Sequence, residues 1–579
     1  MIKKLKKLPV GISDFKELIE NNYYFVDKTY FIKEIINADA KVLLLPRPRR
    51  FGKTINLSML RFFFEKTIPL RPGGFAGQDG GQAGGYGGQA ISNKQLFRGL
   101  KIEKCQECMS YQEQYPVIFF TLKDIKETNW ESTFNKIKDL IGQEFKRHKY
   151  LLDSNILDSN DKNIFKNIIS RKAEQFDYEN SLKKLTEYLT KFHNKKPIIL
   201  IDEYDSPINA GFINNYYIQI INFMRGFLGA GLKDNPNLEK AVITGILRVA
   251  RESIFSGLNN LAVYSILKED FSEFFGFEQS EVEKLLKDYN LENKIDEVKK
   301  WYDGYNFGNH KIYNPWSILN FISNKAEFSV YWVNTSDNQL IRDLISRGDE
   351  ELKTILENII AGASIEYNID ENIVFPDIYK INSAVFSLLL FSGYLTATKV
   401  RKNYDNPVKL SMPNQEIKIL YEKIIIYWFE NSINFSKYKF MLENLLSGNI
   451  EEFKEYFINF VTSSFSSFDL PENESEKIYH AFVLGILVTL SKDYIVKSNR
   501  ESGFGRYDVM LIPNDKNKLG LVIEFKKAEQ KETIDNAVTA AIKQIEEKKY
   551  TQELKDLGIK NILSLGIAFK GKEVKILKK

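Results

Sequence analysis

The residues from Lys41 to Leu60 combine an apolar run, a basic turn and a Gly-Lys-Thr triplet that opens an amphipathic stretch. This order predicts a buried strand over residues 42–45, a loop, and a helix that packs back on the strand. In such a loop Gly52 allows close approach of an anion, Lys53 neutralises its charge, and the Thr54 hydroxyl can ligate Mg²⁺. The stretch therefore predicts a site for a nucleoside triphosphate.

One position departs from the general pattern of phosphate-binding loops. That pattern has a glycine five residues before Gly52, where this chain has Arg47 followed by Pro48. A Gly-Lys-Thr triplet alone would be weak evidence for nucleotide binding. The interpretation therefore depends on a second set of residues elsewhere in the chain.

Two acidic residues, Asp202 and Glu203, follow the apolar run at 198–201. Carboxylates at the carboxyl end of a buried strand are costly unless they meet a metal or water, and ligands of open α/β sheets bind at that edge. We expect Asp202 to hold Mg²⁺ through its water shell and Glu203 to orient or deprotonate the attacking water. The alternative is a strand that ends in a polar turn, and the pairing with Gly-Lys-Thr favours the metal site.

A second pair of carboxylates lies near the C-terminus. Residues 498–513 and 519–528 predict two strands joined by a polar turn. If this hairpin is centred on Lys516, Asp508 and Glu524 face each other across the pair. Like charges in that arrangement destabilise a sheet unless a cation lies between them, so the pattern indicates a divalent metal.

Lys526 follows Glu524 by two residues and therefore lies on the same face of the predicted strand. A metal held by two carboxylates beside an ammonium group can activate water and stabilise charge on a phosphodiester. The pattern thus predicts a second site for phosphate chemistry. The alternative is an amphipathic hairpin whose charges are solvated.

Four stretches together resemble the AAA-ATPase-like family of P-loop proteins: Phe25–Thr29, Arg47–Thr54, Leu200–Asp205 and Thr244–Arg248. The loop of that family is itself arginine-rich, which makes Arg47 a family trait and leaves open whether the loop hydrolyses ATP or only binds it. The resemblance implies that Arg50 belongs to the nucleotide site and that Thr244 senses the γ-phosphate. It also implies that Arg248 or Arg251 stabilises transferred charge, against the alternative of surface residues in a turn.

The C-terminal hairpin resembles the PD-(D/E)XK nuclease superfamily. Asp508 matches the acid of the motif, and Glu524–Lys526 matches its Glu-x-Lys. Glu476, on a helix predicted over 474–490, matches the additional acid that these folds often carry. A later predicted helix bears Gln544, with Tyr550 soon after. The resemblance implies that Asp508, Glu524 and Glu476 are metal ligands.

The length of 579 residues exceeds what one hydrophobic core normally supports. Strands alternating with helices predict an α/β protein with three parts. We expect a P-loop NTPase parallel sheet over 1–275, a helical middle domain over 276–455, and a restriction-endonuclease-like α/β domain over 456–579. The Gly/Gln/Ala tract at 71–90 lacks periodicity and predicts a flexible surface insertion in the first domain.

Composition argues against nucleic-acid binding through overall charge and against a membrane-spanning protein. The net charge of +5 is slight for this length, so nucleic-acid affinity would have to come from local patches. The apolar runs are too short to cross a bilayer, and two cysteines without a secretory leader predict a cytoplasmic protein. Cys105 and Cys108 have metal-ligand or redox spacing, but no second pair or nearby histidine accompanies them, so we expect a structural role.

These observations favour an ATP-dependent switch joined to a metal-dependent nuclease, with ATP and Mg²⁺ as cofactors and Mn²⁺ as a possible substitute at the nuclease site. The expected partner is nucleic acid, DNA rather than RNA by analogy, and P-loop ATPases of this kind often assemble as homo-oligomers. Two other hypotheses stay open. One is a signalling or scaffold ATPase whose C-terminal domain only binds nucleic acid or protein, and the other is an ATP-independent nuclease.

Overall fold

The protein separates into two compact units, residues 1–334 with 368–408, and residues 335–367 with 409–579. The computed structural model describes residues 5–67, 92–248, 260–332, 350–360, 362–372, 375–378, 381–399, 407–432, 435–467, 485, 490, 493–502, 505–528, 532–570 and 573–579. The Gly-rich insertion predicted at 71–90 therefore lies outside the described residues.

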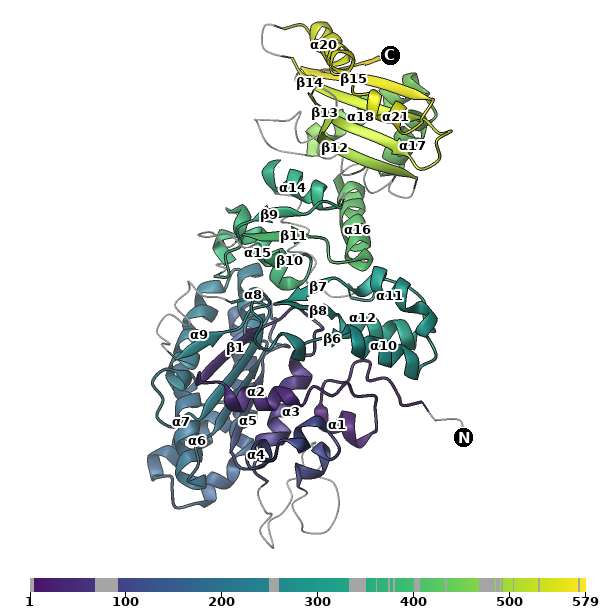
Figure 1. The fold of residues 1–579 in the computed structure, drawn as a ribbon. Coiled ribbons are helices and arrows are strands. Elements are labelled where there is room, and N and C mark those ends of the chain that lie inside the picture. Colours follow the sequence, from purple (N-terminus) through teal and green to yellow (C-terminus); the bar gives the residue numbers. More distant parts are fainter. Residues whose placement is uncertain are drawn as a thin grey trace. The chain divides into compact units, whose positions relative to one another are not determined.

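The first unit is built around a five-stranded parallel sheet in the order β2-β3-β4-β1-β5 (Figure 1). Its strands are β1 (Val42–Pro46), β2 (Val117–Thr121), β3 (Ile198–Asp202), β4 (Lys240–Gly245) and β5 (Leu261–Val263). Strands β1 and β3 are buried along their whole length, as expected for parallel strands covered on both faces. The strand predicted over residues 42–45, the apolar run at 198–201 and the P-loop type of sheet are confirmed, whereas β5 was not predicted because three residues are too short to show a pattern.

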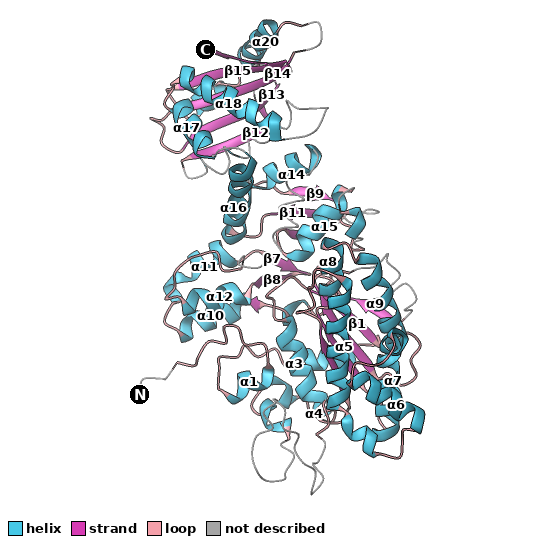
Figure 2. Cartoon of the chain, turned by 180° about the vertical axis from the view of Figure 1, so that it is seen from behind, coloured by secondary structure: helices cyan, strands magenta, loops and turns pink. Residues whose placement is uncertain are grey.

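Helices flank this sheet, as the cyan and magenta ribbons of Figure 2 show. Helix α3 packs against β2, β3 and β4, and α7 packs against α9. The helices are α1 (Phe15–Glu20), α2 (Tyr30–Asn37), α3 (Lys53–Phe64), α4 (Gln106–Met109), α5 (Trp130–Arg147), α6 (Ser159–Ile169), α7 (Gln175–His193), α8 (Ser206–Ile213) and α9 (Tyr217–Leu232). Short 3-10 segments occur at η1 (Asn93–Phe97), η2 (Lys101–Lys104), η3 (Lys149–Asp153) and η4 (Ser272–Phe274).

A small antiparallel sheet follows in the same unit, in the order β6-β8-β7. Its elements are β6 (Phe277–Glu278), α10 (Gln279–Asp288), η5 (Glu292–Lys294), α11 (Ile295–Tyr302), β7 (Tyr305–Phe307), β8 (His310–Tyr313) and α12 (Pro315–Ser323). Tyr302 lies in the apolar core between these helices, and Trp301 stacks on Phe328. The aromatic residues around position 302 therefore serve packing. The unit also includes η6 (Phe375–Asp377), α15 (Asn382–Ser392) and β10 (Thr396–Lys399).

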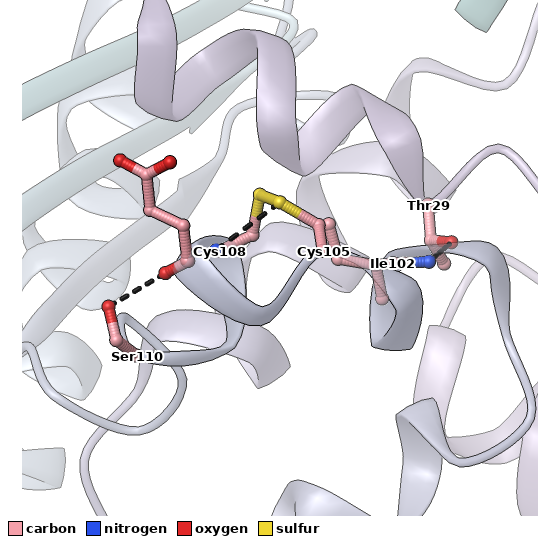
Figure 3. The surroundings of a disulfide bond; sticks show 6 residues. Thr29, Ile102, Cys105, Cys108 and Ser110 are labelled. Carbon is pink, nitrogen blue, oxygen red and sulfur yellow. Dashed lines mark hydrogen bonds between the residues drawn. A yellow bond between two sulfur atoms is a disulfide. The ribbon is translucent and has the colours of Figure 1, made fainter.

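The Asp27-Lys28-Thr29 stretch is joined by hydrogen bonds to η2. Thr29 Oγ1 donates to Asp27 and accepts from the backbone N–H of Ile102 at 3.0 Å. Beyond Ile102 the chain enters the Cys105–Cys108 disulfide, in which the Cys108 N–H donates to Cys105 Sγ (Figure 3). The cysteine spacing that also suits metal sites is thus used for a covalent link beside α4.

The second unit contains a five-stranded mixed sheet in the order β12-β13-β14-β15-β16 (Figure 1). Its strands are β12 (Tyr494–Ser502), β13 (Gly505–Pro513), β14 (Gly520–Lys527), β15 (Ile562–Lys570) and β16 (Glu573–Lys578). Only the β14–β15 pair is parallel, and the connection between them passes through α20 (Ile534–Glu547) and α21 (Gln552–Asp556). This order of elements agrees with the predicted hairpin and the later helix that bears Gln544.

The other described elements of the second unit are α14 (Glu350–Ile360), β9 (Ile365–Tyr367), β11 (Val408–Ser411), α16 (Gln415–Ser432), α17 (Phe435–Leu446) and α18 (Ile450–Ser467). The stretch predicted as a helical middle domain, 276–455, is therefore shared between the two units and includes short strands. Among the described residues, no helix has both the length and the apolar character needed to cross a membrane.

Candidate nucleotide and metal sites

Three polar side chains meet where the strands of the first sheet end. Because β4 lies between β1 and β3, the carboxyl ends of all three strands share one edge. Thr54, at the start of α3, donates from Oγ1 to Asp202 Oδ2 at 2.7 Å, and Thr244 donates to Asp202 Oδ1 at 2.7 Å. Asp202 is fully buried (0% exposed). The hydroxyl of the predicted loop and the predicted acid therefore lie side by side, as a magnesium site requires.

The loop between β1 and α3 is closed by its own lysine. Gly52 has φ +86°, a conformation that favours glycine, and α3 begins at the next residue. Lys53 is 4% exposed, and its Nζ donates to the carbonyls of Arg47 and Pro48, both at 3.0 Å. Burial lowers the pKa of the Lys53 ammonium, while the negative charges of Glu203 and Asp202 act in the opposite direction. An incoming anion would compete with the two carbonyls for this ammonium group.

Arg47 belongs to the core below the loop. Its guanidinium donates to the carbonyls of Tyr264 at 2.6 Å and Phe271 at 3.2 Å, and it lies 4.8 Å from the centroid of the Phe275 ring. Burial lowers the pKa of Arg47 to about 9. Among the described residues no carboxylate forms an ion pair with it. The residue in place of the usual glycine is thus an internal strut that joins β1 to the segment after β5.

Substitution of this strut should be costly. Arg47→Met retains much of the aliphatic volume but leaves the carbonyls of Tyr264 and Phe271 without their donor, so we expect the first unit to lose about 2 to 4 kcal/mol of unfolding free energy. Chemical denaturation followed by tryptophan fluorescence measures this loss. Arg50→Met, in which an exposed side chain is changed, is the matched control and should change stability by less than about 1 kcal/mol.

The two other arginines implied by the family resemblance differ in their surroundings. Arg50 is exposed, and its guanidinium lies 3.8 Å from the centroid of the Trp316 ring. Arg248 is half-buried just after β4. Arg251 lies outside the described residues. Roles for Arg50 and Arg248 in nucleotide binding stay predictions.

Glu203 occupies a strained turn directly after β3. Its φ of +50° is unusual for a residue with a side chain. One carboxylate oxygen accepts from Ser206 Oγ at 3.1 Å. Burial favours the neutral carboxyl, but the positive charges of Lys53, Arg49 and Lys126 hold its pKa below the usual range. Glu203 is therefore an ionised carboxylate surrounded by cations.

Asp205 is a site residue to which the sequence analysis assigned no role. It is buried, and its Oδ2 accepts the backbone N–H groups of Ile246 and Leu247, both at 2.8 Å. A Cβ atom at Gly245 would approach Asp205 Oδ1 to 2.7 Å, so only glycine fits there. Asp205 thus fixes the turn after β3 to the end of β4. The sequence feature that could have pointed to Asp205 is its position as a third acidic residue within four residues of the end of β3.

The carboxylates of the second unit lie on neighbouring antiparallel strands. The ladder between β13 and β14 pairs Val509 with Ile523 and Leu511 with Leu521, so continuing the register places Asp508 opposite Glu524. This is the register predicted from the turn. Asp508 Oδ2 accepts from the backbone N–H of Phe525 at 2.7 Å.

Glu524 is held between a cation and an amide. It is 2% exposed, and its Oε1 lies 3.3 Å from Lys526 Nζ and accepts from Gln544 Nε2. Gln544 also contacts the hydroxyl of Tyr550 at 3.3 Å. Four of the residues named in the sequence analysis are thus gathered here. Glu476, the additional acid, lies outside the described residues.

The surroundings of the second carboxylate oxygen of Glu524 indicate whether a metal ion fits beside Asp508 and Glu524. Glu524 Oε2 is buried and has no hydrogen-bond partner within the part of the chain that the structure describes. Burial and the neighbouring Asp508 raise the pKa of Glu524 to about 8. A divalent cation would supply the missing partner and relieve the repulsion between the two carboxylates. Asp508 and Glu524 therefore fit a metal ion.

This pair predicts a pH dependence that metal should remove. With metal chelated, Glu524 ionises near pH 4.5 in the unfolded chain and near pH 8 in the folded one, so its contribution to stability is lost as the pH rises through that interval. We expect Glu524→Gln to become progressively more stable than wild type between pH 5 and pH 8 in EDTA. Melting temperatures across this range measure the difference, and a constant difference would contradict the assignment.

Two segments of the chain match known families. Residues 9–75 and 86–255 match the family described as "Predicted AAA-ATPase", and residues 474–579 match the PD-(D/E)XK nuclease superfamily. An uncharacterized protein in the vnfD 5′ region of Azotobacter chroococcum mcd 1 is 24% identical over 449 residues, which cover 77% of this chain and 75% of that protein. The chain therefore carries an AAA-ATPase-like region over residues 9–255 and a C-terminal domain of the PD-(D/E)XK nuclease superfamily over residues 474–579.

Proposed function

We propose that this protein binds and hydrolyses ATP in its first unit and cleaves DNA phosphodiesters in its second, with the nucleotide controlling cleavage. The observation that carries the proposal is the buried oxygen of Glu524 that lacks a partner among the described residues, next to Asp508 and together with Lys526. A domain retained only for binding would have no reason to keep such a costly carboxylate pair.

In the nucleotide half, Lys53 would exchange its carbonyl partners for the β- and γ-phosphates, which carry more negative charge. Thr54 and Asp202 would hold Mg²⁺, which supplies charge neutralisation at the phosphates. Glu203 would accept the proton of the attacking water at its carboxylate, and the buried Thr244 hydroxyl would keep Asp202 oriented. Restricting the position of the water and the phosphate is the main contribution of such a site.

In the nuclease half, Asp508 and Glu524 would hold the metal, which lowers the pKa of a bound water and polarises the phosphate when present. Lys526 would place a positive charge beside the same phosphate and stabilise the charge that develops on its oxygens. Gln544, through its bond to Glu524, would orient that carboxylate. The preference for DNA over RNA rests on analogy with the superfamily.

The proposal is tested by incubating the purified full-length chain with end-labelled single- and double-stranded DNA and RNA, in Mg²⁺, Mn²⁺ or EDTA. We expect DNA cleavage in either metal and none in EDTA. Cleavage that persists in EDTA would exclude the metal site. ATP hydrolysis without cleavage of any nucleic acid would instead favour a signalling ATPase with a binding module.

A further inference from the structure

The positive charges of three side chains from different parts of the first unit act on the Glu203 carboxylate. Lys53 belongs to α3, Arg49 to the loop after β1, and Lys126 to the loop after β2. Of these three cations, Lys53 has a role in the proposed nucleotide site as a phosphate ligand. The arrangement raises the question of what Arg49 and Lys126 do beside the carboxylate.

The loop that carries Lys126 starts at the acid pair. Strand β2 is the neighbour of β3, and the pairing continues beyond the last strand residue, because the N–H of Leu122 donates to the carbonyl of Asp202 at 2.9 Å. Ile125 is buried, and the carbonyl of Glu127 accepts from the Tyr216 hydroxyl at 2.7 Å. The backbone is therefore fixed on both sides of Lys126, and the loop begins at the edge of the sheet where the nucleotide site lies.

Lys126 itself is exposed to solvent, although the residue before it is in the core. Its ammonium is attracted by Glu203, Asp124 and Asp205 and repelled by Arg49. Partial burial of the ammonium lowers the pKa of Lys126. An exposed lysine whose positive charge is attracted by Glu203 and Asp205 is well placed to meet an anion that enters from solvent.

The loop that carries Arg49 is held through its backbone. Its backbone carbonyl accepts from Trp332 Nε1 at 3.2 Å and from Asn314 Nδ2 at 3.4 Å. The loop is therefore tied to the segment that follows the small antiparallel sheet. The guanidinium is largely removed from solvent and is attracted by Glu203 and Asp205. Arg49 and Lys126 thus carry two positive charges close enough to repel each other. The same glutamate, Glu203, attracts both of them.

We propose that Arg49 and Lys126 bind the terminal phosphate of the nucleoside triphosphate. Glu203 is the counter-ion of both side chains until the nucleotide binds. This inference rests on the proposed nucleotide site and assigns its specificity. A γ-phosphate carries more charge than one carboxylate and presents several oxygens, so it would draw both cations away from Glu203.

Arg49 and Lys126 would then distinguish a nucleoside triphosphate from a diphosphate, because both bind the third phosphate. A nucleoside diphosphate, which ends at the β-phosphate, would gain from Lys53 but not from Lys126. An ordinary surface ion pair between Lys126 and Glu203 would have no effect on discrimination between the two nucleotides. The ratio of ATP affinity to ADP affinity therefore separates the proposed role from a structural one.

The experiment measures binding of Mg·ATP and Mg·ADP by calorimetry to full-length wild type, Lys126→Ala, Lys126→Arg and Lys123→Ala. Lys123 belongs to the same loop, is half-buried, and serves as the matched control. We expect Lys126→Ala to lose about 10-fold or more in ATP affinity with ADP affinity unchanged. Lys126→Arg should retain most of the affinity for ATP, and Lys123→Ala should bind both nucleotides as wild type does.

The outcomes are distinguishable. If Lys126→Ala weakens ATP and ADP by the same factor, or weakens neither, Lys126 does not read the terminal phosphate and this inference is overturned while the nucleotide site stands. If the wild type binds neither nucleotide, the proposed nucleotide site itself is wrong. Arg49→Lys, which keeps the charge but not the planar group, should show the same selective loss of ATP affinity, by a smaller factor.

Discussion

Lys53→Met should reduce the affinity of the protein for ATP by at least about 100-fold, because it removes the ammonium group that would bind two phosphates. Methionine retains the length and apolar stem of the buried side chain. The change removes a buried charge but leaves the carbonyls of Arg47 and Pro48 without their donor, so the variant should remain folded and should melt only slightly earlier than wild type. Calorimetric titration with Mg·ATP and a thermal melt measure the two effects.

The matched control for this variant is Lys33→Met. Lys33 lies on the exposed face of α2, away from the buried residues of that helix. The same change in charge there should leave ATP affinity within about 2-fold of wild type. Equal ATP affinity in Lys53→Met and wild type would show that the loop does not bind nucleotide through its lysine.

Glu524→Gln should lower metal-dependent cleavage by at least about 100-fold, since even the outer-shell partners of a metal commonly contribute 10- to 100-fold. The amide is close to the carboxylate in shape but has no negative charge to hold a divalent cation. It also removes the repulsion from Asp508, so the second unit should become more stable in EDTA at neutral pH. Loss of cleavage together with a gain in metal-free stability distinguishes a metal ligand from a residue that only supports the fold.

Asp515→Asn is the control in the same hairpin. Asp515 is exposed in the turn, where its Oδ1 accepts from the backbone N–H of Asn517 at 3.0 Å, a contact that asparagine preserves. We expect wild-type cleavage and wild-type affinity for Mn²⁺. If Glu524→Gln instead binds Mn²⁺ and cleaves as wild type does, Asp508 and Glu524 do not form the metal site.

The sequence predicted those features that depend on short segments. The apolar runs identified β1 and β3, and the position of the two acids directly after an apolar run was enough to place them at the sheet edge. The turn between β13 and β14 fixed the register that places Asp508 opposite Glu524. In each case local spacing and strand alternation determine the geometry.

Other features depend on contacts between distant segments and could not be read from local pattern. Arg47 stands where phosphate-binding loops usually have glycine, and the sequence does not show that it is buried and that carbonyls more than 200 residues away accept its hydrogen bonds. The roles of Asp205 and Lys126 follow from the adjacency of β2, β3 and β4, which the order of strands along the chain does not specify. The three residues of β5 carry too little pattern to be recognised.

The central claim is that nucleotide at the first site controls phosphodiester cleavage at the second. It is tested most directly by measuring the rate of Mg²⁺-dependent DNA cleavage with and without ATP, in wild type, Lys53→Met and Asp508→Ala. We predict that ATP changes the wild-type rate, that Lys53→Met loses this response, and that Asp508→Ala shows no cleavage while still binding ATP. Cleavage by Asp508→Ala at the wild-type rate, or a wild-type rate that ATP does not alter, would contradict the claim.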